Sequence, residues 1–218
     1  VLDDGWFGER NHDRSSLGDW VVNKEKLPNG LEGLAEKINK MGMKFGLWFE
    51  PEMISENSEL FREHQNWHIA APDVRACKSR HQWILDFANP EVVEYMKRTI
   101  GGMLKENDIS YVKWDMNRNM SDYYSQALPK EQQGEFAHRY ILGLYDVLRR
   151  SFEPRPHILL ESCSSGGNRF DLGMLTFGPQ IWCSDNTDPI SRLEIQENLS
   201  YLYPQSTFGA HVSASPHA

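Results

Sequence analysis

The sequence predicts an α/β fold, and more specifically an incomplete (β/α)8 barrel. Two observations predict it. Strand-like apolar runs alternate with runs of helical period along the 218 residues, a pattern typical of βα units and a parallel sheet. Successive strand-like runs also end in acidic residues, and the active site of a barrel lies at its strand ends. The alternation alone also fits a doubly wound sheet, whereas the strand ends favour the barrel.

Length and charge limit the classes of function. The chain is 39% hydrophobic and 25% charged, which is enough to bury one sizeable core. It begins with Val and stops at 216-PHA-218 without a terminating element, so we expect a piece of a longer protein. The net charge of −8 and a pI near 5.5 argue against nucleic acid or an anionic membrane as partner. No apolar run has the length of a membrane span.

The cysteines indicate the redox compartment. Cys77, Cys163 and Cys183 are too few and too scattered for a disulfide framework. The chain also lacks the C-x-x-C and H-E-x-x-H metal patterns. A reducing compartment is therefore favoured, and we expect a cytoplasmic protein. A signal peptide would lie upstream of residue 1, so the sequence leaves export open.

The first elements alternate strand, helix, strand. Residues 1–4 have the apolar start of a strand, and residues 31–42 have helical periodicity that Gly42 stops. The apolar run 44–50 then predicts a second strand. The buried face of the helix is expected to carry Leu31, Leu34, Ala35, Ile38 and Met41.

The middle of the chain repeats this order. Residues 89–106 open with the cap Asn89 and a Pro at the first helical position, which predicts a helix. It leads into the strand-like run 111–115. A long helix over 131–152 then leads into the strand-like run 157–162. The buried face of this long helix is expected to carry Phe136, Tyr140, Ile141, Leu144 and Leu148.

The last elements follow a Gly-rich loop and a short helical piece. Residues 180–185 predict a strand, and 188–204 predict a helix with Asp188 as its cap and a Pro in first position. Residues 207–213 predict the final strand. The loop 161–167 resembles a phosphate cradle but lacks the Lys and Ser/Thr of a P-loop, so we reject that function.

The strand ends share one chemistry. Five successive strand-like runs end in an acid and the sixth carries a histidine: Asp3 and Asp4, Glu50, Asp115, Glu161, Asp185 and His211. Solvated loop charges need not recur at the same point of each unit. A ring of carboxylates at a barrel mouth serves two chemistries. It binds a divalent cation for isomerisation or enolisation, or it cleaves glycosidic bonds with a pair of carboxyl groups.

Neighbouring residues favour the second chemistry. Lys113 lies two positions before Asp115, so both side chains point to the same side of the strand. A lysine there keeps the aspartate ionised, as a nucleophile requires, whereas a metal site usually excludes an ammonium. Trp48, Trp114 and Trp182 lie within three residues of strand-end acids. Aromatic faces beside carboxylates suit a sugar ring.

Asp115 and Asp185 are the expected pair of carboxyl groups. Their strands are separated by one other strand, and alternate strands of a barrel share a layer of inward side chains. The two carboxylates can therefore face each other across a small substrate. A separation of about 5–5.5 Å would mean retention of anomeric configuration, and about 6.5–9.5 Å would mean inversion.

Six stretches, in order along nearly the whole chain, carry a resemblance to a known family. They are 2-LDDGWF-7, 47-LWFEPEM-53, 85-LDFANPEV-92, 112-VKWDMNR-118, 161-ESCSSGG-167 and 182-WCSDNTD-188. With them the chain resembles the bacterial α-galactosidases of glycoside hydrolase family 36. The resemblance implies a (β/α)8 catalytic domain without metal or organic cofactor. It also implies a retaining hydrolase of terminal α-galactosyl residues in melibiose, raffinose and stachyose.

The resemblance also implies residue roles. Asp115 would be the nucleophile and Asp185 the general acid/base of a double displacement. Asp185 must then hold a proton near neutral pH, which a sealed pocket with negative neighbours would favour. The expected substrate-binding residues are Asp3, Asp4, Trp48, Arg80, Lys113, Asn117, Cys163 and Gly166.

By the same resemblance, residues 1–218 are the central part of the catalytic domain. Their strands would be barrel strands two to seven. The first barrel strand and the flanking N- and C-terminal β-domains would lie outside this chain. The expected partner is a small galactoside, and the full-length enzyme would be compatible with a homo-oligomer.

Three alternatives stay open. They are a related α-galactosyl transferase similar to raffinose synthases, a metal-dependent barrel isomerase, and a sugar-binding protein without catalysis. Some polar residues have structural interpretations as well. Asp188 is expected to be a helix cap, Glu50 and Glu161 to orient neighbours, His211 to be a rim or a structural residue, and Arg118 to be an ion-pair partner or solvated.

Overall fold

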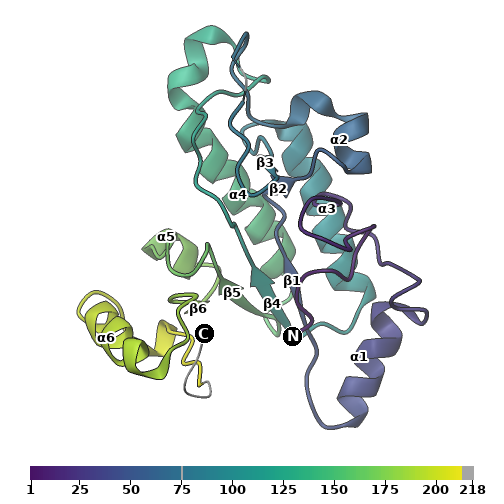
Figure 1. Ribbon diagram of the computed structural model, residues 1–218, viewed down its shortest axis with the longest axis vertical. Helices are drawn as coiled ribbons and strands as arrows, with labels where there is room; N and C mark the ends of the chain where they lie inside the picture. Colours follow the sequence, from purple (N-terminus) through teal and green to yellow (C-terminus); the bar gives the residue numbers. More distant parts are fainter. Residues whose placement is uncertain (75, 213–218) are drawn as a thin grey trace.

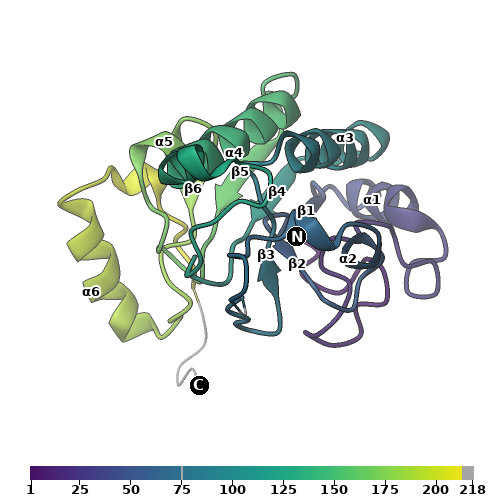
Figure 2. The ribbon, with the colours of Figure 1, turned by 90° about the horizontal axis from the view of Figure 1, so that it is seen from above.

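A parallel sheet forms the centre of the computed structural model, which describes residues 1–74 and 76–212. Its four strands lie in the order β1-β4-β5-β6. They are β1 (Gly46–Phe49), β4 (Tyr111–Trp114), β5 (Leu159–Ser162) and β6 (Gln180–Ile181). Helices connect successive strands, and Figure 2 shows these helices in an arc outside the strands. The fold is therefore part of a (β/α)8 barrel, as predicted.

The described residues contain six α-helices (Figure 1). They are α1 (Gly30–Lys40), α2 (Glu59–Glu63), α3 (Pro90–Glu106), α4 (Phe136–Phe152), α5 (Leu172–Leu175) and α6 (Pro189–Ser200). Short 3-10 turns occupy Gln65–Trp67, Lys130–Glu135 and Gln205–Thr207. Over the part of the chain that is described, no helix has the length and apolar character to cross a membrane.

The predicted helix starts are confirmed by their caps. Asn89 accepts a hydrogen bond from the Glu91 N–H at 2.9 Å. Asp188 accepts from the N–H groups of Ile190 and Ser191 at 3.1 and 2.9 Å. Each cap satisfies backbone donors of a first helical turn, which have no partner inside the helix.

The core lies between the sheet and the helices that cover it. All four residues of β1 are buried, and α3 and α4 pack side by side against the outer face of the sheet. Their buried residues recur every four positions, as one face of a helix requires. On α3 they are Val92, Met96, Ile100 and Leu104, and on α4 they are Phe136, Tyr140, Leu144, Leu148 and Phe152, with Val147 and Ser151 buried beside them.

Two of the residues expected in the core are exposed. Met41 is 71% exposed because α1 ends at Lys40, so Met41 follows the helix instead of continuing its buried face. Ile141 is 36% exposed. It follows the buried Tyr140 directly, and adjacent residues of a helix point in different directions.

The outer strand predictions need correction. Residues 1–4 contribute one parallel bridge, in which Leu2 pairs with Leu47. The predicted strand 207–213 is wrong. A 3-10 turn ends at Thr207, and Phe208 makes a single bridge to Ile181. Phe208 and Gly209 are buried and the residues from 210 to 212 are exposed, so the burial expected of a strand ends at Gly209. Residues 213–218, which include the last residue of this predicted strand and the end 216-PHA-218, lie outside the described residues.

The strand predicted over 180–185 is also shorter than expected, because β6 is only Gln180–Ile181. A small antiparallel sheet was missed altogether. It joins β2 (Met53–Ile54) to β3 (Trp83–Ile84). Strands of two residues are too short to show a periodic pattern. This sheet matters for function because the segment between its strands brings Arg80 to the carboxyl ends of β1 and β4.

Candidate active site

Two rows of side chains cross the sheet on one face. Trp48 pairs with Lys113 and Lys113 with Glu161 in the strand register. Two positions further along, the Asp115 N–H donates to the Phe49 carbonyl at 2.8 Å and the Met116 N–H to the Cys163 carbonyl at 3.1 Å. Because side chains alternate along a strand, both rows share a face. The rows are Trp48, Lys113 and Glu161, and then Glu50, Asp115 and Cys163.

This shared face points away from the helices. Trp114, between Lys113 and Asp115, directs its ring to the opposite side, where it contacts Phe152 of α4 with ring centroids 6.3 Å apart. Lys113 and Asp115 therefore face the inside of the barrel. The prediction that both side chains point to one side is confirmed.

Asp115 is held in one orientation by three N–H donors. Its side chain is buried, and one carboxylate oxygen accepts from Trp48 Nε1 at 3.1 Å and from Asn117 Nδ2 at 2.8 Å. The other oxygen accepts from the Met116 N–H at 2.9 Å. A carboxylate fixed in this way at a strand end is arranged to act on a molecule inside the barrel.

Lys113 contacts a different carboxylate from the one expected. Its Nζ lies 3.8 Å from an Asp3 oxygen and 5.3 Å from the centroid of the Trp182 ring. Burial lowers the pKa of Lys113, but the negative charges of neighbours such as Asp3 and Asp115 oppose this effect, and the pKa is raised overall. Lys113 is thus a cation within the acidic cluster, and its closest ion pair is with Asp3.

Asp4 lies beside Asp3 in sequence but has a separate partner. The guanidinium of Arg10 donates to both Asp4 oxygens, with Nε at 3.0 and 3.1 Å and Nη2 at 2.9 Å. Arg10 is buried and also donates to the Ser15 carbonyl at 2.9 Å. Sequence reasoning missed Arg10. An arginine in a loop, six residues after its carboxylate partner Asp4, belongs to no helical or strand pattern that would point to the pair.

Arg80 reaches the site from an unusual turn. Its Nη1 donates to the Asn117 carbonyl at 3.1 Å. Arg80 and His81 have φ of 51° and 60°, and the Gln82 N–H donates to the Ser79 carbonyl at 3.0 Å. Positive φ at both central residues is typical of hairpin turns that favour Asn and Gly. Two larger side chains here indicate backbone strain that accompanies the placement of Arg80.

Glu50 is a buried carboxyl group beside Asp115. It is 2% exposed and accepts from the Asn117 N–H at 2.6 Å. Burial, and then the negative charge of Asp115, raise the pKa of Glu50 to about 8. The prediction that Glu50 orients a neighbour by a hydrogen bond is confirmed. Burial also raises the pKa of Glu161, and the hydrogen bond from Tyr111 opposes this effect.

The raised pKa of Glu50 predicts a pH dependence of stability. Between the ordinary value of 4.5 and about 8, the folded protein holds a proton that the unfolded chain has lost. The free energy of unfolding should therefore fall as pH rises through this window, by at most about 1.4 kcal/mol per pH unit. In the full-length protein, Glu50→Gln should remove this pH dependence. The difference in Tm between Glu50→Gln and the wild type should therefore shift in favour of the variant as pH rises from 5 to 8.

A surface substitution controls for the lost charge. Glu36 on α1 is paired with Lys40, which lowers the pKa of Glu36. Glu36→Gln should leave the slope between pH 5 and pH 8 unchanged. Parallel Tm profiles for the wild type and Glu50→Gln would refute the assignment.

The loop after β5 contacts both the segment that follows Asp115 and the segment that carries Asp185. Ser165 Oγ donates to Asn117 Oδ1 at 3.3 Å. Gly166 has φ of +85°, and a Cβ there would lie 2.8 Å from Ser184 Cα and 3.2 Å from the Asp185 nitrogen. Only glycine therefore allows this approach of the two backbones.

Gly166→Ala should disturb this contact. The methyl group meets backbone atoms at a strained φ, so we expect the free energy of unfolding to fall by about 1–3 kcal/mol. We also expect kcat/KM to fall in the full-length protein. The matched control is Gly102→Ala on α3, where a Cβ meets nothing within 4 Å. That change should raise stability by about 0.5–1 kcal/mol, and equal effects of the two variants would contradict the close approach.

Asp185 lies at the edge of this arrangement. Its side chain is exposed, and it accepts a hydrogen bond from Trp182 Nε1 at 2.9 Å. The sealed surroundings expected for it are therefore absent from the described residues. Trp182 contacts both Lys113, as above, and His211, whose ring centroid lies 5.3 Å away. Trp182 thus links Asp185 to the inner cluster, and His211 lies beside it.

Cys163 is buried, and it lies beside Asp115 in the second row. Burial, and then the negative charge of Asp115, raise the pKa of its thiol, so it is a neutral group at neutral pH. Among residues 1–74 and 76–212, no group of three or more His, Cys, Asp or Glu side chains is arranged to hold a metal ion.

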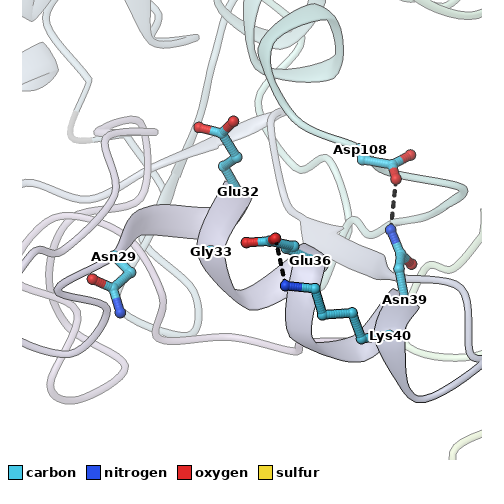
Figure 3. Close-up of a pocket in the computed structure, with 7 residues that line it drawn as sticks. All are labelled: Asn29, Glu32, Gly33, Glu36, Asn39, Lys40 and Asp108. Atoms are coloured by element: carbon cyan, nitrogen blue, oxygen red, sulfur yellow. Dashed lines mark hydrogen bonds and ion pairs between the residues drawn. The ribbon is translucent and has the colours of Figure 1, made fainter.

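The structure has cavities away from this cluster. One of about 610 Å³ lies against α1 (Figure 3), where Lys40 pairs with Glu36 and Asn39 donates to Asp108. These two contacts lie on the protein surface. Another cavity, of about 440 Å³, adjoins the site behind Asp115 and is lined in part by Met116, Tyr140, Ser164 and Arg169.

Known proteins resemble this chain over its whole length. The family model Melibiase matches residues 1–218. Alpha-galactosidase AgaA of Geobacillus stearothermophilus is 56% identical over 216 residues, which cover 99% of this chain and 30% of the relative. Alpha-galactosidase Mel36A of Lactobacillus acidophilus is 51% identical over the same coverage. The chain thus spans about 30% of the length of these curated relatives.

Solved structures agree with these relatives. The crystal structure of the GH36 α-galactosidase AgaA superposes with a TM-score of 0.96 at 56% identity, over 99% of this chain and 30% of that one. AgaB of the same organism gives 0.97 at 56% identity, over 100% of this chain and 30% of that one. Variants of AgaA were solved with raffinose and with stachyose. Because the family model matches every residue and the relatives align throughout, this chain belongs to the Melibiase family.

Proposed function

We propose that the full-length protein is a retaining α-galactosidase that hydrolyses terminal α-galactosyl residues of oligosaccharides such as melibiose, raffinose and stachyose. One observation carries the proposal. Asp115 is buried at the inner end of β4, and Trp48 and Asn117 orient its carboxylate. The names of the relatives as α-galactosidases, and the raffinose and stachyose complexes of AgaA, support the substrate class.

The solved complexes also support the pair of catalytic residues. The AgaA complex with raffinose carries an Asp-to-Asn substitution, and the complex with stachyose carries an Asp-to-Ala substitution. These two aspartates are 70 positions apart in AgaA. Asp115 and Asp185 are also 70 positions apart. We therefore assign Asp115 as nucleophile and Asp185 as general acid/base.

The reaction has two steps. In the first, an Asp115 oxygen attacks the anomeric carbon, the bond from that carbon to the leaving oxygen breaks, and Asp185 gives its proton to that oxygen. In the second, Asp185 takes a proton from water, whose oxygen forms a bond to the anomeric carbon and displaces Asp115. Each step inverts the anomeric centre, so the product keeps the α configuration.

The remaining inner residues would bind the galactose ring. Lys113 and Asp3 supply a donor and an acceptor 3.8 Å apart, which suits hydroxyl groups. The Trp182 ring next to Lys113 offers a face for the apolar side of a sugar. Asn117 and Arg80 connect the loops around Asp115. Asp4 would act together with Arg10, its partner in this structure.

The test of the proposal is the first product released from raffinose by the full-length protein. Proton NMR recorded before mutarotation should show α-galactose and sucrose in equal amounts. Release of β-galactose would contradict retention, and binding of galactose without any release would indicate a sugar-binding protein. A transferase would pass the galactosyl group to an added acceptor sugar instead of to water. Activity that disappears with a chelator would favour the metal-dependent class.

A further inference from the structure

We propose that a buried ion pair between Glu52 and Arg169 positions Asp115 for catalysis. The inference rests on the proposed function and adds two residues that do not touch the substrate. Both side chains lie on the outer side of β4, opposite the inner face. They contact the residues on either side of Asp115, which are Trp114 and Met116.

Glu52 is the centre of this contact. Its carboxylate is 0% exposed. One oxygen accepts from Trp114 Nε1 at 2.9 Å and the other from the Tyr140 hydroxyl of α4 at 2.8 Å. Arg169 Nη1 donates to both oxygens at 2.7 and 2.8 Å. The carboxylate thus connects β4, α4 and the loop after β5.

Arg169 extends the contact to the other neighbour of Asp115. Its Nη1 lies 3.3 Å from Met116 Sδ. Within the described residues, Arg169 Nε and Nη2 are buried without a hydrogen-bond partner, so its one direct ion pair, with Glu52, has to offset the cost of burying the guanidinium. A single donor nitrogen therefore determines where Arg169 lies relative to Met116.

Arg169 also lies in the loop after β5, whose residues contact Asn117 and the backbone of Asp185. Within this loop, Ser164 Oγ donates to the Met116 carbonyl at 2.9 Å. Ser165 and Gly166 make the contacts with Asn117 and with the Asp185 backbone described above. The Glu52–Arg169 pair thus fixes both the strand end that carries Asp115 and the loop that lies beside it.

Close packing does not replace these hydrogen bonds. Met116, Ser164, Tyr140 and Arg169 line the cavity of about 440 Å³ behind Asp115. Side chains that border empty space can shift when a directional contact is lost. A shift of about 1 Å at a catalytic group can cost on the order of 10²-fold in rate.

The experiment compares single and double substitutions in the full-length protein. Glu52→Gln and Arg169→Met each leave one buried charge without its partner. Both should lower Tm, and both should lower kcat on raffinose by roughly 10- to 100-fold. KM and inhibition by galactose should stay near wild type, because neither residue touches the sugar.

The double variant separates positioning from folding stability. With both charges removed, Glu52→Gln/Arg169→Met should recover much of the lost Tm, because no unpaired charge is then buried. Its kcat should stay low, because the contact with Met116 is still absent. Recovery of kcat together with Tm would overturn the proposal, and so would single variants with the wild-type kcat.

Two further variants keep the test decisive. Arg169→Lys keeps the charge and should fold even where Arg169→Met does not; its kcat should lie between those of the wild type and Arg169→Met. Ser58→Ala removes the side-chain cap of α2, in which the buried Ser58 Oγ accepts from the Phe61 N–H at 3.1 Å, and this hydrogen bond involves neither member of the pair nor their partners. It should lower Tm without changing kcat. A wild-type protein that releases no galactose would refute the proposed function, whereas an active wild type with unaffected variants would refute only the positioning role.

Discussion

Replacement of Asp115 by glycine should abolish turnover, with a loss of at least about 10⁴-fold in kcat, because the variant lacks the carboxylate that forms the covalent bond to the anomeric carbon. Trp48 and Asn117 lose their acceptor but remain in place around the space that is left. That space fits a small anion. Azide should therefore restore cleavage of p-nitrophenyl α-galactoside in the variant.

The rescued product identifies the missing group. Azide attacks the α-galactoside once, with a single inversion, so Asp115→Gly should form β-galactosyl azide. Azide should leave the rate of the wild type unchanged. A variant that is still active without azide, or one that azide does not rescue, would contradict the role of Asp115.

Replacement of Asp185 by asparagine should have the second-largest effect. General acid–base catalysis contributes about 10²- to 10⁴-fold, and we expect kcat/KM on raffinose to fall by that amount. The rate of the first step on p-nitrophenyl α-galactoside should fall much less, because the p-nitrophenolate leaving group needs little protonation. The hydrogen bond from Trp182 can persist with an amide oxygen at this position.

Azide gives the opposite product in this second variant. It intercepts the galactosyl-enzyme without needing a base, so Asp185→Asn should form α-galactosyl azide after two inversions. Equal losses on raffinose and on the aryl galactoside would contradict the assignment of Asp185. So would formation of the β-azide.

Much of the fold could be predicted because its signals are local. The caps Asn89 and Asp188 depend on a few neighbouring residues and are found as predicted. The predicted face of α4 is buried at Phe136, Tyr140, Leu144 and Leu148 but not at Ile141. The outer strand predictions failed for a different reason. A strand forms only where another strand supplies hydrogen-bond partners. The segment around Phe208 has one such bridge, to Ile181.

Part of the inner face of the site could also be predicted from the sequence. Lys113 and Asp115 were expected on one side of their strand, because alternation is a property of every strand. The register then aligns them with Trp48 and Cys163. The hydrogen-bond donors to Asp115 were not predicted correctly. Sequence reasoning expected Lys113 beside it, whereas the direct contacts come from Trp48 and Asn117.

The contacts on the outer side of β4 could not be predicted from the sequence. Glu52 and Arg169 are 117 positions apart in the chain, and their pair depends on how the loops after two different strands fold. A lone acid or a lone arginine in a loop is indistinguishable in sequence from a solvated residue. Only the structure shows that Glu52 is buried and paired.

The most direct measurement is mass spectrometry of the full-length enzyme after reaction with a fluorinated galactosyl fluoride. Such a reagent forms the covalent intermediate quickly and releases it slowly. Digestion should yield one labelled peptide, containing 112-VKWDMNR-118, with the fluorogalactosyl group on Asp115. A label on Asp185 or on any other residue would contradict the assignment of the nucleophile. An active enzyme that forms no covalent adduct would contradict the double displacement itself.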